Sequence, residues 1–125
     1  IKEADIVITT ALIPGKKAPI LVTEEMVASM KFGSVILDMA VEQGGNVIGS
    51  EINKTIQKNG VTIIGESNIP SLLPMNASEL YAKNIQTLLV HLATNEKFNW
   101  DLAEDITKGS LIVHNGTPVH PSILK

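Results

Sequence analysis

Three short apolar segments, each followed by a loop of small or polar residues, constrain the fold of this 125-residue chain more than any other feature. Residues 6–8, 34–37 and 61–65 are rich in Ile and Val and too short for core helices, so they predict buried strands. Apolar residues make up 44% of the chain and aromatic residues only 3%, which predicts the aliphatic core typical of parallel strands. Strands alternating with helical segments predict an open α/β sheet.

A helix is predicted between the first two strands. Thr23 is a favourable N-cap residue, and Glu24 and Glu25 follow in the first turn, where the helix dipole stabilises anions. Gly33 can supply a left-handed stop, so we expect the helix to end there.

A β-hairpin is predicted next, because the Asn-Gly dipeptide at 59–60 is the strongest two-residue hairpin signal. It would join residues 55–58 to residues 61–65. The alternative is a short helix that carries Ile52 and Ile56.

The second half of the chain predicts one long helix and a second hairpin. Asn76 is a good N-cap with Glu79 three residues later, and apolar residues then recur with helical spacing to about Ala93. Residues 110–113 and 117–119 flank another Asn-Gly turn, which predicts the hairpin.

Composition excludes several classes of function. The net charge is −3 with no Arg, so neither a basic surface for nucleic acid nor a guanidinium clamp is expected. The lack of Cys excludes disulfides and thiolate chemistry, and no apolar run is long enough to span a bilayer. His91, His114 and His120 lack metal-ligand spacing, so we predict neither a metal site nor a catalytic histidine.

The candidate ligand-binding loops are those that leave the predicted strands, at residues 9–15, 38–46 and 66–74. Ligands of open α/β sheets bind at the carboxyl ends of the strands. If the strands are neighbours, the three loops line one edge.

The chemistry of these loops is ambiguous on residue types alone. Thr10 and its neighbours would admit a flat ring, but they also suit an ordinary turn. Asp38 and Glu42 are suited to acid–base work or to ribose hydroxyls, or else to turn capping and solvation. Asn68 suits a carboxamide partner, or a plain turn before Pro70.

Longer strings carry a family resemblance. Residues 5–19, DIVITTALIPGKKAP, resemble the signature of the proton-translocating NAD(P) transhydrogenase alpha subunit, a family related to alanine dehydrogenase. The resemblance continues through residues 23–27, 30–36, 38–46, 68–71, 77–84 and 120–121. Alanine dehydrogenases usually have a catalytic Asp where this chain has Glu42, so the resemblance favours transhydrogenase. The alternatives are an alanine dehydrogenase-type fragment and a non-catalytic NAD-fold module that serves assembly.

The resemblance implies a specific activity. It implies an NAD(H)-binding component that passes hydride directly to NADP(H) on a partner component, while a membrane component couples the transfer to proton movement. It also implies a homodimer of the full component, placed peripherally on the cytoplasmic side of the bacterial inner membrane or on the mitochondrial matrix side. No protein residue is catalytic in the covalent sense, because the chemistry lies in positioning the nucleotide.

The resemblance also suggests which residues contact the cofactor. They are Thr10, Ala11, Leu12, Met39, Ala40, Glu42 and Asn68.

The implied fold is the C-terminal half of a Rossmann-like NAD-binding domain, followed by a segment that returns to the first domain. Residues 1–74 would belong to the NAD(H) domain, and residues 75–125 would form a crossing helix and strands of the first domain. Because the chain starts at Ile1, almost inside a strand, we expect the remainder of the subunit upstream. The family's glycine-rich phosphate turn is not in this chain, so we expect these residues alone to bind NAD weakly and to self-associate.

Overall fold

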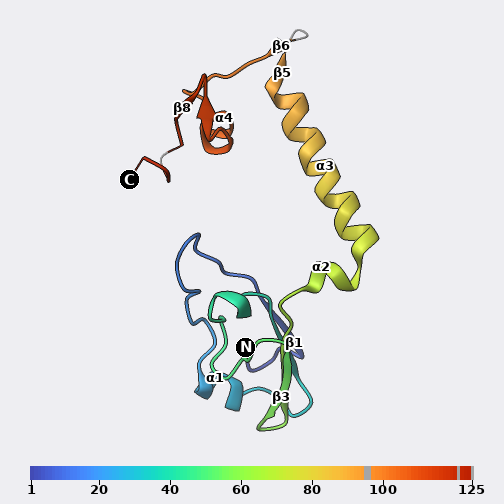
Figure 1. Ribbon diagram of the computed structural model, residues 1–125. Helices are drawn as coiled ribbons and strands as arrows, with labels where there is room; N and C mark the ends of the chain where they lie inside the picture. The colour runs from blue at the N-terminus through green and yellow to red at the C-terminus, as the bar shows by residue number, and fades with distance from the viewer. Residues whose placement is uncertain (95–96, 121, 125) are drawn as a thin grey trace. The chain divides into compact units, whose positions relative to one another are not determined.

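The computed structural model describes residues 1–94, 97–120 and 122–124 and divides the chain into two compact units (Figure 1). We call Ile1–Leu73 unit 1 and Pro74–Lys125 unit 2. Each is described by itself.

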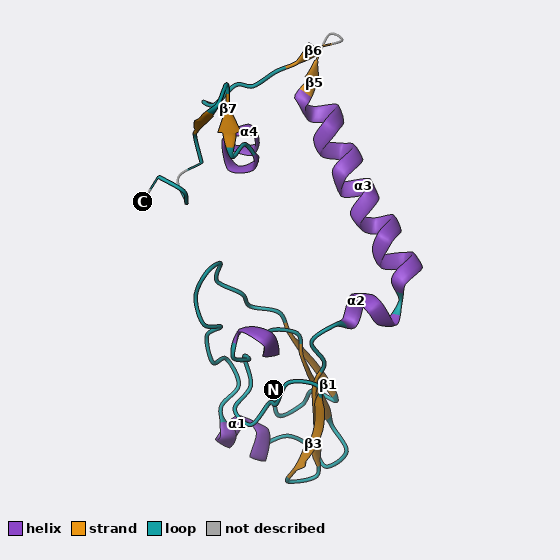
Figure 2. Cartoon of the chain, viewed as in Figure 1, coloured by secondary structure: helices purple, strands orange, loops and turns teal. Residues whose placement is uncertain are grey.

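Unit 1 is built on a four-stranded sheet, drawn in orange in Figure 2. The order of its strands is β1-β2-β4-β3. The strands are β1 (Ile6–Thr9), β2 (Val35–Asp38), β3 (Lys54–Lys58) and β4 (Val61–Gly65). β1, β2 and β4 are mutually parallel, whereas β3 pairs antiparallel with β4 at one edge. The predicted α/β fold with a parallel sheet is thereby confirmed.

The predicted hairpin is also confirmed. Lys58 and Val61 close the β3–β4 ladder, and Asn59 and Gly60 between them both have positive φ, at 53° and 78°. A primed turn of this kind matches the twist of paired strands, which is why the Asn-Gly signal prevails over the helical alternative. The alternative prediction, a short helix that carries Ile52 and Ile56, is wrong, because Ile56 lies in β3.

The first predicted helix is present but shorter. α1 (Glu24–Ala28) is capped by Thr23, whose Oγ1 accepts a 3.3 Å hydrogen bond from the Met26 amide. It ends well before Gly33, with Ser29 as its C-cap, and the Gly33 amide donates to the carbonyl of Gly60 at 2.8 Å. Gly33 has a φ of +87°, but it serves the approach to β2 rather than the helix end.

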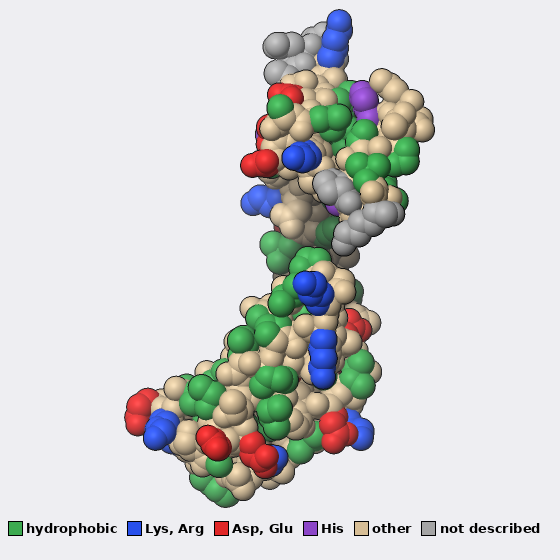
Figure 3. All heavy atoms as spheres, turned by 90° about the vertical axis from the view of Figure 1, so that its left-hand side faces the viewer, with side chains coloured by type: hydrophobic (Ala, Val, Ile, Leu, Met, Phe, Trp, Pro, Cys, Tyr) green, Lys and Arg blue, Asp and Glu red, His purple; other side chains and the backbone are tan. Residues whose placement is uncertain are grey.

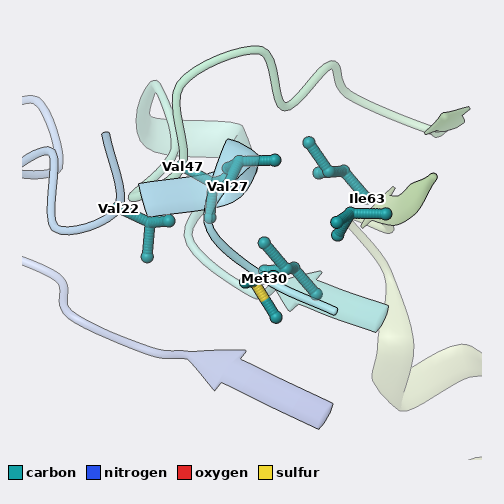
Figure 4. Close-up of a cluster of buried hydrophobic side chains, with 7 residues drawn as sticks. Val22, Val27, Met30, Val47 and Ile63 are labelled. Carbon is teal, nitrogen blue, oxygen red and sulfur yellow. The ribbon is translucent and has the colours of Figure 1, made fainter. Parts of the chain in front are cut away.

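The core of unit 1 lies between α1 and one face of the sheet. Figure 4 shows side chains of α1, of the strands and of the loops converging there. The buried cluster comprises Val22, Val27, Met30, Ile36, Val47, Val61 and Ile63, with Val7 packed against it. These aliphatic side chains account for the low aromatic content of the sequence.

The opposite face of the same sheet is apolar and uncovered within unit 1. Ile6 and Ile8 point away from Val7, because side chains alternate along a strand, and they are 69% and 59% exposed. Parallel sheets are normally covered on both faces. On the face of unit 1 shown in Figure 3, acidic and basic side chains are interspersed and no patch of a single sign stands out.

Unit 2 consists of one long helix followed by short elements. They are α3 (Pro74–Leu92), β5 (Ala93–Thr94), β6 (Lys97–Phe98), α4 (Asp105–Ser110), β7 (Val113–His114) and β8 (Thr117–Pro118). β5 pairs antiparallel with β6. β7 pairs antiparallel with β8 around Asn115 and Gly116, so the predicted second hairpin is confirmed in a shortened form.

Two boundaries in unit 2, and one short helix at the end of unit 1, differ from prediction. α3 begins at Pro74, a residue preorganised for the first helical turn, and Asn76 therefore lies inside the helix rather than at its cap. The loop predicted at 66–74 contains a short helix, α2 (Ile69–Leu72). The strand predicted from residue 110 starts only at Val113, because α4 extends through Ser110.

α4 is held by Glu104 at its N-terminus. One carboxylate oxygen of Glu104 accepts from the Ile106 amide at 2.8 Å and the other from the Thr107 amide at 2.7 Å. These two hydrogen bonds, with a further contact from His91 at 3.2 Å, lower the pKa of Glu104 to about 2. The contact with His91 ties α4 to α3 inside unit 2. No described helix combines the length and apolarity needed to traverse a lipid bilayer.

Candidate functional site at the carboxyl edge of the sheet

Three loops of unit 1 follow the parallel strands at the same edge of the sheet. β1, β2 and β4 are adjacent and parallel, and their last residues are Thr9, Asp38 and Gly65. Thr9 lies directly opposite Asp38 in the ladder, and the Met39 amide extends the pairing by donating to the Thr9 carbonyl at 2.9 Å. The predicted gathering of the three loops at one edge is therefore confirmed.

Asp38 is the centre of hydrogen bonding at this edge. It is fully buried, and Oδ1 accepts from the Thr9 hydroxyl at 3.2 Å and from the Ala40 amide at 3.0 Å. Oδ2 accepts from the amides of Asn46 at 2.9 Å and Val47 at 3.2 Å. A buried polar group needs such partners, and here each carboxyl oxygen accepts at least two hydrogen bonds. Of the three interpretations of Asp38, the structure supports turn capping, because both carboxyl oxygens are buried and bonded within the protein.

The glycines of the second loop allow it to fold around Asp38. Gly44 and Gly45 have φ values of +98° and +76°, which L-residues with side chains rarely adopt. A Cβ on Gly45 would lie 2.7 Å from Oδ2 of Asp38. Gly45 therefore needs to be glycine both for its backbone conformation and for the approach to the carboxylate.

Asn46, also fully buried, connects the second loop to the first. Its Oδ1 accepts from the Ala11 amide at 2.9 Å, and its Nδ2 donates to the carbonyls of Ala11 at 3.0 Å and Pro19 at 2.7 Å. Asp38 holds Asn46 through the main chain, and Asn46 holds Ala11 through its side chain.

The predicted residues of the first loop differ in exposure. Thr10 is exposed, Leu12 is 51% exposed, and Ala11 between them is half-buried. Within the part of the chain that the structure describes, the main-chain groups of Thr10 and Leu12 form no hydrogen bond with the protein. They can therefore serve an external ligand.

The second loop brings Met39, Ala40 and Glu42 to the edge in different settings. Met39 is 43% exposed and Glu42 is exposed in the 3₁₀ turn η1 (Val41–Gln43). Ala40 is buried, its amide bonds to Asp38, and its carbonyl accepts from Gln43 and Gly45. Met39 and Glu42 thus present side chains outward, whereas Ala40 contributes a small, buried surface.

The third loop carries Asn68 immediately before α2. The side chain is exposed, and it does not cap the helix that follows. The main-chain amide of Asn68 donates to the Glu66 carboxylate at 3.1 Å. The main-chain carbonyl of Asn68 accepts from the hydroxyl of Ser71 at 2.8 Å. The loop backbone is therefore fixed by its own residues, while the Asn68 carboxamide faces outward.

Sequence reasoning did not single out Asn46 as an individual residue. The available signal was the pair of consecutive glycines before it, which here both adopt positive φ and precede the buried Asn46. The arrangement offers backbone groups, a carboxamide and apolar side chains, which suit a flat, polar-edged ligand. Among the described residues no cluster of acidic or histidine side chains is arranged to hold a metal ion.

Comparison with known proteins gives a consistent set of relatives. The family model described as "Alanine dehydrogenase/PNT, C-terminal domain" matches residues 1–121. An NAD(P) transhydrogenase alpha subunit protein of Rhodospirillum rubrum is 47% identical over 97% of this chain. The corresponding protein of Rickettsia prowazekii is 46% identical over 96% of the chain. The chain covers only 32% and 31% of those two relatives.

Solved structures point the same way. The crystal structure of transhydrogenase from Sinorhizobium meliloti superposes with a TM-score of 0.69 at 45% identity, over 97% of this chain and 33% of that one. An L-alanine dehydrogenase superposes with a TM-score of 0.63 at 33% identity, over 98% of this chain and 35% of that one. The α/β architecture is thus shared with both groups, and this chain belongs to the alanine dehydrogenase/PNT C-terminal domain family.

Proposed function

We propose that this chain is part of the NAD(H)-binding component of an NAD(P) transhydrogenase, which passes hydride between NADH and NADP⁺. The observation that carries the proposal is the single carboxyl edge where Thr10, Met39 and Asn68 emerge from three neighbouring parallel strands. Ligands of open parallel sheets bind at such edges. The names of the transhydrogenase relatives support the assignment.

The groups at this edge fit the nicotinamide end of a dinucleotide. The main-chain groups of Thr10 and Leu12 and the outward carboxamide of Asn68 can exchange hydrogen bonds with a ring amide and a ribose. Asp38 is fully buried behind the loop and presents no charge to the ligand. Ala40 is buried and would lie beneath the ligand as part of the folded loop.

The chemistry of this function is positioning. NADH, when bound, supplies a hydride from C4 of its nicotinamide ring. The residues of this chain would orient that ring, and the exposed apolar side chains of Leu12 and Met39 would pack against it and exclude water. Ala11 and Glu42 complete the set of residues we propose around the cofactor.

The proposal extends to the organisation of the full component. Residues 1–74 would form the second half of a Rossmann-like NAD(H) domain, and residues 75–125 would supply the crossing helix and terminal strands of the first domain. The partners would be the remainder of the subunit, a second copy in a homodimer, an NADP(H)-binding component and a membrane component. The protein would then lie peripherally at the cytoplasmic face of the bacterial inner membrane, or at the matrix face in mitochondria.

A labelled-hydride experiment tests the activity. The full-length protein that contains these residues is mixed with its NADP(H)-binding partner, NADP⁺ and NADH deuterated at C4. We expect deuterium to appear at C4 of NADPH without loss to water, because the rings meet directly. Deuterium washed out into solvent, or no NADPH formed, would contradict the proposal.

An alanine dehydrogenase activity is the second candidate, supported by the alanine dehydrogenase of Staphylococcus epidermidis, which is 45% identical over 62% of this chain. Oxidation of NADH by the full-length protein with pyruvate and ammonia would favour it. A protein that binds NADH and drives neither reaction would instead be an assembly module.

A further inference from the structure

The Asn46 side chain copies the hydrogen-bonding pattern of a strand neighbour. A carboxamide presents one acceptor and two donors, and here all three are used, toward the Ala11 amide, the Ala11 carbonyl and the Pro19 carbonyl. Asp has no donor when ionised, and Leu has neither donor nor acceptor. The site is therefore specific for a carboxamide.

Asn46 is itself fixed before it reaches Ala11. Its amide donates to both oxygens of the Asp38 carboxylate, at 3.2 and 2.9 Å. Asp38 is anchored in turn at the end of β2 and accepts from the hydroxyl of Thr9 on β1. All three side chains are buried, and the sheet thus sets the position of the first loop through two side chains in series.

In the first loop, some main-chain groups bond to the protein and others stay available to a ligand. The Ala11 amide has its only hydrogen bonded to Asn46, and the Ala11 carbonyl already accepts one hydrogen bond from the same side chain, so Ala11 has no donor to offer a ligand. Thr10 and Leu12, on either side, have unpaired main-chain groups within the described residues and are exposed. A ligand at this edge would therefore contact Thr10 and Leu12, whose positions are fixed by Ala11 between them.

We propose that Asn46, supported by Asp38, is a positioning residue for the nucleotide, which fixes Ala11 so that Thr10 and Leu12 contact the nicotinamide end of the cofactor. The proposal rests on the function proposed above. It assigns the main-chain donors that meet the ligand to Thr10 and Leu12 and excludes the Ala11 amide, which Asn46 occupies.

Residue-resolved hydrogen exchange on the full-length wild-type protein tests the proposal without any substitution. In the absence of NADH, the Ala11 amide should exchange at least tenfold more slowly than those of Thr10 and Leu12. Addition of NADH should slow exchange at Thr10 or Leu12 and leave Ala11 unchanged. An Ala11 amide that exchanges as fast as its neighbours overturns the positioning role, whatever NADH does.

The same experiment separates this proposal from the proposed function. If NADH protects no amide of the first loop while Ala11 is slow, the internal hydrogen bonds stand. The NAD(H) function at this edge then falls, together with the ligand contacts assigned to Thr10 and Leu12.

The substitution Asn46→Asp tests the consequence for turnover. It removes both donors and sets a carboxylate against two carbonyl oxygens, so we expect Ala11 exchange to accelerate and kcat to fall about tenfold or more. The NADH dissociation constant should rise by a smaller factor, because this loop would hold only one end of the cofactor. A purely structural role would lower the folded fraction and leave kcat per folded molecule unchanged.

Gln57→Glu is the matched control, since it makes the same amide-to-carboxylate change on the exposed side of β3. It should alter neither exchange at Ala11 nor kcat. If Asn46→Asp behaves like this control, the proposal is wrong. If Asn46→Asp does not fold, the wild-type exchange pattern decides.

Discussion

The hydroxyl group of Thr9 donates a 3.2 Å hydrogen bond to Oδ1 of Asp38, across the register pair that ends β1 and β2. Thr9 is 6% exposed and Asp38 is fully buried, so water cannot replace this bond. The two loops of the candidate edge therefore start from a common, internally bonded point.

Loss of that hydroxyl should be costly. Thr9→Val keeps the shape of the side chain but leaves a buried carboxylate oxygen with one donor fewer, which costs about 1–3 kcal/mol. Urea denaturation of the full-length protein measures the change. Thr55→Val on the exposed part of β3 is the control and should stay within about 0.5 kcal/mol. Equal effects at both positions would show that the Thr9 bond contributes nothing.

Gly45 and Gly15 form a natural pair for a test of close approach. Both have positive φ, at +76° and +70°, but a Cβ would contact Asp38 at Gly45 and nothing within 4 Å at Gly15. Alanine at either site incurs a backbone penalty of about 1–2 kcal/mol. Gly45→Ala should be more destabilising than Gly15→Ala by about 1–3 kcal/mol, measured by the same denaturation. Similar values would mean that the second loop moves away from Asp38 without cost.

α4 should loosen in acid. Hydrogen bonds from the amides of Ile106 and Thr107, with a contribution from His91, hold the pKa of Glu104 at about 2, below its ordinary value of 4.5. A depressed folded-state pKa stabilises the fold above the unfolded pKa, and the stabilisation is lost as pH falls through the window from about 4.5 to about 2. Hydrogen exchange at Ile106 and Thr107 should accelerate across that window, beyond the intrinsic pH dependence of exchange.

Glu104→Gln should remove most of that pH dependence, because its carboxamide does not ionise. Glu79→Gln, an exposed change in α3, serves as the control and should leave the profile of α4 intact. A wild-type profile in the Glu104→Gln protein would assign the acid sensitivity to another group.

The 125 residues alone should bind NADH poorly. The candidate edge provides contacts for one end of a dinucleotide, and this chain has no glycine-rich phosphate turn of the dinucleotide-binding type. Titration of NADH by calorimetry or fluorescence checks this. A micromolar dissociation constant would contradict the expectation.

The uncovered sheet face should make the 125-residue chain self-associate. Ile6 and Ile8 expose apolar surface on β1, which is also an edge strand of the sheet. We expect species larger than a monomer in size-exclusion chromatography, and a shift toward the monomer with Ile8→Thr. A wild-type monomer that melts cooperatively would show that the face is tolerated by itself.

Much of unit 1 was predictable from its sequence because local signals agreed with the final fold. Short runs of Ile and Val became β1, β2 and β4, and the Asn-Gly dipeptide at 59–60 became the turn before β4. Errors arose where a distant partner took over a local group. Gly33 was expected to stop a helix, but its amide bonds to Gly60 instead.

The candidate edge was predictable in outline and not in detail. The order of strands places the three loops together, as expected from parallel pairing. Which side chains face inward depends on contacts between residues 29 and 35 positions apart, such as Thr9 with Asp38 and Ala11 with Asn46. Spacing along the sequence does not encode such contacts. The sequence alone therefore left three roles open for Asp38: an acid–base group, a ligand of ribose hydroxyls, or a turn cap. The cofactor contacts of Glu42 and Asn68 stay predictions.

The parallel pairing of β1 with β2 also governs the order of events during folding. A hairpin such as β3–β4 can close within a few residues, but parallel neighbours meet only after the intervening chain has crossed back, with a larger loss of loop entropy. The bond between Thr9 and Asp38 requires those strands to be aligned, and the position of Asn46 depends on Asp38. We therefore expect the candidate binding edge to form after the sheet.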